Sequence, residues 1–167
     1  MNDLSGEDPI VNQRSGRLLI VEDERTLRQL VAQFLRAEGY DVEEAADGQE
    51  GVCFFVDRGP FDVVLLDLNL PCLPGEEVCR QIKHDQPNQS VVICSAAVLD
   101  CHLDVLKGLG VDQFLGKPYH PLDLLDRIAS EMSRTRSRQR SDPASGLYRP
   151  RLPGRSEQGR AASRQGP

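Results

Sequence analysis

Five polar side chains follow apolar runs of the sequence, at the points where buried strands would end. Glu22 and Asp23 follow the first run, Asp67 the third, Ser95 closes the fourth, and Lys117 comes soon after the fifth. A charge cannot sit unpaired inside a buried layer, so each charged residue must lie where its strand emerges. In open parallel sheets the ligand crevice lies outside the carboxyl ends of the strands. We therefore expect these side chains to meet at one edge.

Three carboxylates at one edge need a cation. Two like charges ~4 Å apart repel by roughly 4 kcal/mol at an effective dielectric of about 20. Oxygen-only ligands in a small site suit Mg²⁺, which takes one or two carboxylates and keeps several waters. A metal-flanked carboxylate beside a lysine suits phosphoryl transfer to Asp67, which would form an acyl phosphate. Lys117 would neutralise charge on the phosphoryl oxygens, and Ser95 would donate a hydrogen bond to one of them.

Other interpretations of single residues stay open. A lone aspartate such as Asp67 can be a loop residue or a helix N-cap, and Glu22-Asp23 can cap the first helix. Ser95 can also be a helix cap without a switching role. The interpretation as a site for phosphoryl transfer therefore depends on all of these residues occurring together.

Five apolar runs alternate with five amphipathic stretches. The runs cover 17–21, 41–46, 63–66, 90–95 and 111–115, and helices are expected around 27–35, 52–56, 75–84, 99–109 and 121–132. Gly39 is expected to end the first helix as a residue with left-handed backbone. Such alternation predicts a five-stranded parallel sheet with helices on both faces, and right-handed crossovers make it doubly wound.

Composition is that of an ordinary soluble globular protein. Of 167 residues, 28% are charged and 39% hydrophobic, and no apolar run approaches the 18 or so residues of a membrane span. The polar, acidic start does not resemble a signal peptide, so a cytoplasmic location is expected. The five cysteines never form C-x-x-C, which favours reduced thiols.

The net charge of −6 conceals a split. Nine of the 20 Lys and Arg residues lie from Ser133 onward, against only two acids, so this part carries about +7 and the rest about −13. The Arg, Ser, Gly and Pro-rich stretch has no apolar periodicity and is predicted to be a disordered tail. We thus predict a flexible segment 1–16, a domain 17–132 and a disordered basic tail 133–167.

Over 17–132 the chain resembles the receiver domain of bacterial two-component response regulators. The matching motifs are Ile20-Val21-Glu22-Asp23, Leu65-Leu66-Asp67-Leu68-Asn69-Leu70-Pro71, Cys94-Ser95-Ala96 and Phe114-Leu115-Gly116-Lys117-Pro118. The resemblance implies a flavodoxin-like fold of strand order 2-1-3-4-5.

The resemblance also implies roles for single residues. Asp67 would be the phosphoacceptor and Lys117 would contact the phosphoryl group. Asp23, Asp67 and the backbone carbonyl of Asn69 would ligate Mg²⁺, with Glu22 acting through water.

Two further features are implied by the family. Ser95 and Phe114 would form the conformational switch, although Phe114 taken alone is more often a core residue. The bond Lys117-Pro118 is a candidate for the cis isomer.

The chain departs from the family pattern at several positions. Glu22 stands where an aspartate is commoner, and Cys72 and Pro74 lie in a loop that often has Gly and Asp. Ala97, two residues after the switch serine, cannot position a water for dephosphorylation.

Two rival classes fit less well. A haloacid-dehalogenase-type phosphatase needs a second carboxylate at position 69, and Asn69 cannot supply it. The stretch from Gly110 to Lys117 differs from a P-loop in glycine spacing, and Pro118 replaces the Ser or Thr.

The resemblance implies a signalling domain rather than an enzyme. Its phosphodonor would be a sensor histidine kinase or a phosphotransfer protein, and its target an output protein that the sequence does not identify. We expect a stand-alone regulator or a phosphorelay intermediate, without a DNA-binding domain and without membrane contact. A homodimer could form through the fourth helix, fifth strand and last helix.

Overall fold

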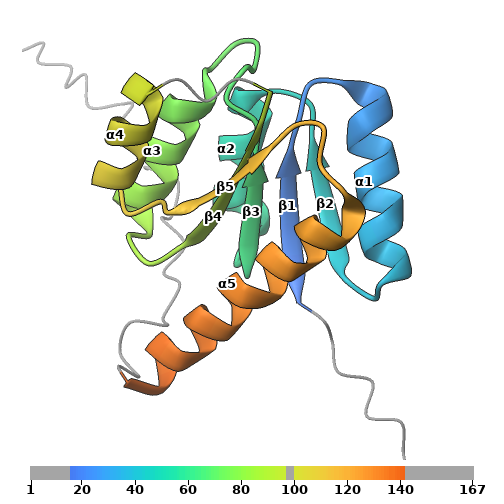
Figure 1. Ribbon diagram of the computed structural model, residues 1–167. Coiled ribbons are helices and arrows are strands. Elements are labelled where there is room, and N and C mark those ends of the chain that lie inside the picture. Colours follow the sequence, from blue (N-terminus) through green and yellow to red (C-terminus); the bar gives the residue numbers. More distant parts are fainter. Residues whose placement is uncertain (1–15, 97–99, 142–167) are drawn as a thin grey trace, which may run out of the picture.

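Five short strands form a wholly parallel sheet in the order β2-β1-β3-β4-β5 (Figure 1). The computed structural model describes residues 16–96 and 100–141. The strands are β1 (Arg17–Val21), β2 (Asp41–Ala45), β3 (Val63–Leu66), β4 (Ser90–Ser95) and β5 (Gln113–Gly116). The helices are α1 (Arg25–Ala37), α2 (Gly48–Arg58), α3 (Gly75–Asp85), α4 (Asp100–Gly108) and α5 (Pro121–Ser141). The predicted doubly wound fold is confirmed.

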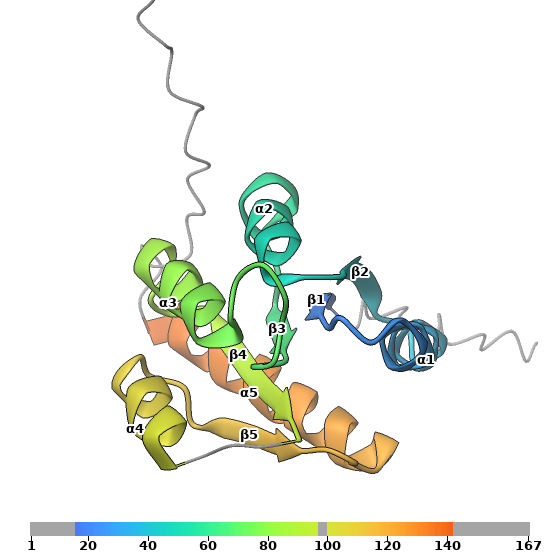
Figure 2. The same cartoon turned by 90° about the horizontal axis from the view of Figure 1, so that it is seen from above.

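Helices cover both faces of the sheet, as the view along it shows (Figure 2). Successive residues of a strand point to opposite faces, so β1 serves two cores. Leu18 and Ile20 pack in the cluster under α1 and α5, while Leu19 and Val21 pack in the cluster under α2, α3 and α4. Burial on both faces explains why the strands read as continuous apolar runs.

Two helix ends near the sheet follow from single residues. Gly39 has φ of 90°, so the prediction that it ends α1 in the left-handed region is confirmed. The Asp47 side chain accepts a hydrogen bond from the Glu50 backbone N–H at 2.8 Å, and the Glu50 carboxylate accepts one from Ala46 N–H at 2.6 Å. This reciprocal capping fixes the start of α2.

The last helix differs from its prediction. We expected it to end near Met132, but α5 continues to Ser141, so residues 133–141 are helical rather than part of a disordered tail. Polar contacts stabilise the added turns: Thr135 Oγ1 bonds Ser90 Oγ at 2.8 Å, and Arg134 bonds Asp112. The prediction relied on apolar periodicity, which stops at Met132.

Several sequence predictions lie outside the described residues. These are the segment 1–15, Ala97 in the stretch 97–99, and the tail beyond residue 141. The division into three regions therefore stays a prediction, apart from the later end of α5. Among the described helices, none is long and apolar enough to cross a membrane.

Candidate functional site

Backbone hydrogen bonds just beyond the strand ends bring the predicted residues to one edge of the sheet. The Asp67 N–H donates to Val21 O at 3.0 Å, and the Glu22 N–H donates to Ala45 O at 3.1 Å. On the other side, the Lys117 N–H donates to Ser95 O at 3.0 Å. The sheet pairing thus continues one residue past β1, β3 and β5.

Three carboxylates converge at this edge. Oxygens of Glu22, Asp23 and Asp67 all lie within 4.8 Å of one another. Glu22 and Asp67 are buried, with 5% and 6% exposure, whereas Asp23 is exposed. The predicted acidic cluster is therefore present, with the Asp23 carboxylate open to solvent.

Lys117 forms ion pairs with both buried carboxylates. Its Nζ lies 2.5 Å from Glu22 Oε2 and 2.5 Å from Asp67 Oδ2. Burial raises the pKa of the Glu22 carboxyl, and the bond and charge of Lys117 only partly oppose this. Burial also acts to lower the pKa of Lys117, but its hydrogen bonds to Asp67 and Glu22 outweigh burial and raise that pKa. The ammonium is thus held charged against the phosphoacceptor candidate.

The loop after β3 packs tightly against Asp67. The Asn69 N–H donates to Asp67 Oδ1 at 3.2 Å, and the Gly75 N–H donates to Leu68 O at 3.0 Å. A Cβ on Gly75 would lie 2.1 Å from the carbonyl oxygen of Asp67, so only glycine fits. Cys72, where the family often has glycine, has φ of 66°.

The donor set fits Mg²⁺. All three candidate side chains offer hard carboxylate oxygens, without a nearby imidazole or thiolate ligand in the cluster found among the described residues. The cluster has more negative charge than Lys117 alone can balance. The Asn69 carbonyl as a ligand stays a prediction.

The switch role of Ser95 and Phe114 stays a prediction, and the structure gives the surroundings of both side chains. Ser95 is 1% exposed, and its Oγ has no hydrogen-bond partner among the described residues. Leaving a buried hydroxyl unsatisfied costs about 1–3 kcal/mol, so such a group is suited to bond an incoming oxygen. Phe114 is half-buried and packs against the core under α2, α3 and α4.

The predicted isomer of Lys117-Pro118 is confirmed, since this peptide bond is cis.

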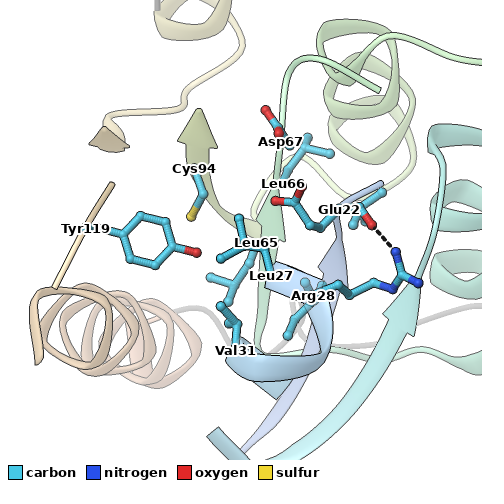
Figure 3. A pocket seen from close by; sticks show the side chains of 11 residues that line it. Glu22, Leu27, Arg28, Val31, Leu65, Leu66, Asp67, Cys94 and Tyr119 are labelled. Atoms are coloured by element: carbon cyan, nitrogen blue, oxygen red, sulfur yellow. Dashed lines mark hydrogen bonds between the residues drawn. The ribbon is translucent and has the colours of Figure 1, made fainter. Parts of the chain in front are cut away.

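Sequence reasoning missed a pocket below the acidic cluster (Figure 3). It lies between α1, the central strands and the residues after β5, and is lined in part by Leu27, Arg28, Leu65, Cys94 and Tyr119. The Tyr119 ring turns its hydroxyl toward this space.

Arg28 is the missed residue with the clearest link to the site. Its Nη1 bonds the carbonyl oxygen of Glu22 at 2.6 Å. Nothing in the sequence separates Arg28 from the other charged residues of an amphipathic helix.

Comparison with known proteins gives one consistent result. The model of the response regulator receiver domain matches residues 18–129. The sensory transduction protein RegX3 of Mycobacterium tuberculosis (strain H37Rv) is 37% identical over 119 residues, covering 70% of this chain and 51% of that protein. The transcriptional regulatory protein TrcR of the same strain is 34% identical over 135 residues, covering 78% of this chain and 51% of that protein.

Solved structures agree with the sequence matches. The CheY-like response regulator receiver domain protein from Methanospirillum hungatei JF-1 has a TM-score of 0.71 at 27% identity, covering 73% of this chain and 97% of that chain. The signal receiver domain of a LuxO repressor protein from Vibrio parahaemolyticus has a TM-score of 0.70 at 28% identity, covering 76% of this chain and 97% of that chain. The chain spans about half the length of the curated relatives named above.

Proposed function

The chain belongs to the response regulator receiver domain family, and from this premise we propose that Asp67 accepts a phosphoryl group in a Mg²⁺-dependent reaction. The donor would be a phosphohistidine of a sensor histidine kinase or a phosphotransfer protein. One observation carries the proposal: the buried Asp67 carboxylate lies 2.5 Å from Lys117 and within 4.8 Å of the Glu22 and Asp23 carboxylates.

The transfer itself is a displacement at phosphorus. An oxygen of Asp67 attacks the phosphorus, the bond from phosphorus to the donor's imidazole nitrogen breaks, and its electron pair stays on that nitrogen. An acyl phosphate results. Lys117, already bonded to Asp67, would turn its ammonium to a phosphoryl oxygen and stabilise the developing charge.

The acidic residues divide into two roles. Asp23, Asp67 and the carbonyl of Asn69 would hold the metal, and Glu22 would act through water. Bound Mg²⁺ supplies charge neutralisation at the phosphoryl oxygens. Glu22, which shares Lys117 with Asp67, would retain the lysine's position before the phosphoryl group arrives.

Ser95 and Phe114 would convert phosphorylation into a change of shape. The Ser95 hydroxyl, which lacks a partner among the described residues, would move to a phosphoryl oxygen. Phe114 would rotate into the space that Ser95 leaves, altering the surface of α4, β5 and α5. Allosteric couplings of about 1–3 kcal/mol would shift the active population roughly 5–150-fold.

The output would be control of a partner protein. The chain would act as a stand-alone regulator or as a phosphorelay intermediate. It could form a homodimer through α4, β5 and α5. Several relatives are named as transcriptional regulators, and the chain spans about half of their length.

Labelling with acetyl phosphate tests the proposal. With Mg²⁺ the chain should gain one acid-stable, alkali-labile label, and Asp67→Asn should abolish it because an amide is not nucleophilic. Asp85→Asn, at the exposed end of α3, is the matched control and should label normally. Asp23→Asn should weaken the dependence on Mg²⁺.

Strong labelling of Asp67→Asn would contradict the assignment of the phosphoacceptor. Unchanged metal dependence in Asp23→Asn would place the ligand role on other residues.

A further inference from the structure

Arg28, near the start of α1, holds the loop that carries two acidic residues of the site. Its Nη1 donates to the carbonyl oxygen of Glu22 at 2.6 Å, drawn as a dashed line in Figure 3, and to that of Asp23 at 3.3 Å. Its Nε lies 3.8 Å from Glu44 Oε2 on β2, and the side chain is only 13% exposed. One guanidinium therefore joins the helix, the acidic loop and the edge strand.

These contacts leave the acidic side chains free. Arg28 bonds the backbone carbonyls of Glu22 and Asp23, so their carboxylates remain available to other partners. The Glu22 carboxylate accepts hydrogen bonds from Lys117 and, at 3.2 Å, from the N–H of Glu24. A guanidinium keeps its charge and presents its donors in a rigid fork, so it can hold two carbonyls in a set relation.

A second arginine of α1 makes a similar set of contacts away from the site. Arg36 Nη1 bonds Glu44 Oε1 at 2.8 Å, and its Nη2 bonds the carbonyl oxygen of Val42 at 2.6 Å. Both arginines thus attach α1 to β2 through Glu44, but the carbonyl that Arg36 bonds lies on β2, whereas those that Arg28 bonds lie in the loop after β1. Of these two arginines, only Arg28 also bonds the loop that carries Glu22 and Asp23.

We infer that Arg28 is a positioning residue for Mg²⁺: it fixes the loop so that the Asp23 and Glu22 carboxylates face the metal before it binds. This inference rests on the proposed function. A loop that must be ordered when the metal binds loses affinity, because fixing backbone dihedrals opposes binding. A ligand shell that is already held avoids that loss.

Charge alone predicts the opposite sign, which makes the inference testable. A cation near the site repels Mg²⁺, so a purely electrostatic Arg28 would weaken binding, and its removal would tighten it. A positioning Arg28 strengthens binding, and its removal weakens it. The direction of the change in Mg²⁺ affinity therefore separates the two roles.

The experiment is a Mg²⁺ titration of the full chain, followed through NMR amide shifts around Asp67. Arg28→Ala should raise the dissociation constant for Mg²⁺ about 10-fold, in the range seen when outer-shell partners of a metal site are removed. Arg28→Lys, which keeps the charge but not the fork, should fall between this variant and the unchanged chain. Arg36→Ala should leave the dissociation constant unchanged.

Acetyl phosphate labelling gives a second readout. In Arg28→Ala the Mg²⁺ concentration needed for half-maximal labelling should rise, while the rate at saturating Mg²⁺ should stay near that of the unchanged chain. Thermal unfolding should show a comparable loss of stability in Arg28→Ala and Arg36→Ala, since both lose an ion pair with Glu44 and a hydrogen bond to a backbone carbonyl. If lost stability alone weakened Mg²⁺ binding, Arg36→Ala would weaken it as much as Arg28→Ala does.

The outcomes are separable. Equal or tighter Mg²⁺ binding by Arg28→Ala, with normal binding by the unchanged chain, would overturn the positioning role and leave the proposed function standing. A weakening of the same size in Arg36→Ala would also overturn it. Absence of Mg²⁺ binding by the unchanged chain would overturn both.

Discussion

At the scale of single residues, the position of Asp67 depends on how closely α3 approaches the end of β3. Gly75 begins α3, and its N–H donates to Leu68 O, directly after Asp67. A Cβ added there would lie 2.1 Å from the Asp67 carbonyl oxygen and 2.6 Å from Leu68 Cα. Both obstacles are backbone atoms, so the loop itself would have to move.

Gly75→Ala should therefore destabilise the domain by about 2 kcal/mol, within the usual range for overpacking. It should also slow acetyl phosphate labelling, because the displaced backbone carries Asp67. Gly108→Ala is the matched control: no atom lies within 4 Å of its Cβ, and alanine at this last position of α4 should stabilise by about 0.5 kcal/mol. Urea unfolding measures both.

Equal stability of the two variants would show that the approach of α3 to β3 is not tight in solution.

The sequence was sufficient to predict most of the site at this scale. The positions of Glu22, Asp67 and Lys117 follow from strand ends, because a parallel sheet brings these to one edge. Arg28 could not be predicted, since its function depends on a side chain reaching back to carbonyls of a loop, and carbonyls carry no sequence signal. The close approach of Gly75 likewise needs the three-dimensional path of the loop.

At the scale of elements, the second half of α5 is held by polar groups. Arg134 bonds Asp112 with two contacts, of 2.9 and 2.7 Å, and also bonds Glu131 at 2.7 Å. Asp112 directly precedes β5, which carries Phe114. The hydrogen bonds from Arg134 lower the pKa of the Asp112 carboxyl, so they favour its charged form. The far end of α5 is thus connected to the strand of the proposed switch.

Asp112→Asn should loosen this end of α5. The pair is partly exposed, with side chains 36% and 56% exposed, so its contribution is at most about 1 kcal/mol. Hydrogen exchange of the amides in 133–141 should accelerate up to about fivefold, the factor that corresponds to such an energy. Asp126→Asn, an exposed change within the same helix, should leave exchange unchanged.

Exchange that is equally fast in both variants, or unaltered by Asp112→Asn, would mean that Arg134 does not anchor the helix.

The end of α5 shows where sequence reasoning stopped. An amphipathic helix is recognised by its apolar face, and that face ends at Met132. The following turns are supported by Thr135, Arg134 and serine hydroxyls that bond carbonyls one turn earlier. The apolar pattern therefore identified the start of α5 but not its length.

At the scale of the whole molecule, the division of charge now has a structural context. Of the nine basic residues from Ser133 onward, Arg134, Arg136, Arg138 and Arg140 belong to α5. The other five lie beyond residue 141, outside the described part of the chain. Residues 1–132 carry about −13, and the basic stretch that follows them begins within the last helix of the fold.

Deletion of residues 142–167 tests whether the remaining basic stretch competes with a phosphodonor for the acidic edge. At low salt the deletion should speed phosphotransfer from a histidine kinase, because a tether holds the competing charges at about millimolar effective concentration. Above physiological ionic strength, where the screening length falls below ~8 Å, the two chains should react alike. Deletion after Ser141 leaves α5 intact. Equal rates at low salt would show that the stretch takes no part in the reaction.

The most direct measurement of the central claim is the location of the acyl phosphate. The chain would be treated with acetyl phosphate and Mg²⁺, reduced with borohydride and digested, and the peptides sequenced by mass spectrometry. Reduction converts a phosphorylated aspartate to homoserine, and we predict homoserine at position 67 alone, dependent on Mg²⁺. Homoserine at Asp23, or no conversion at Asp67 under conditions that label the chain, would contradict the account.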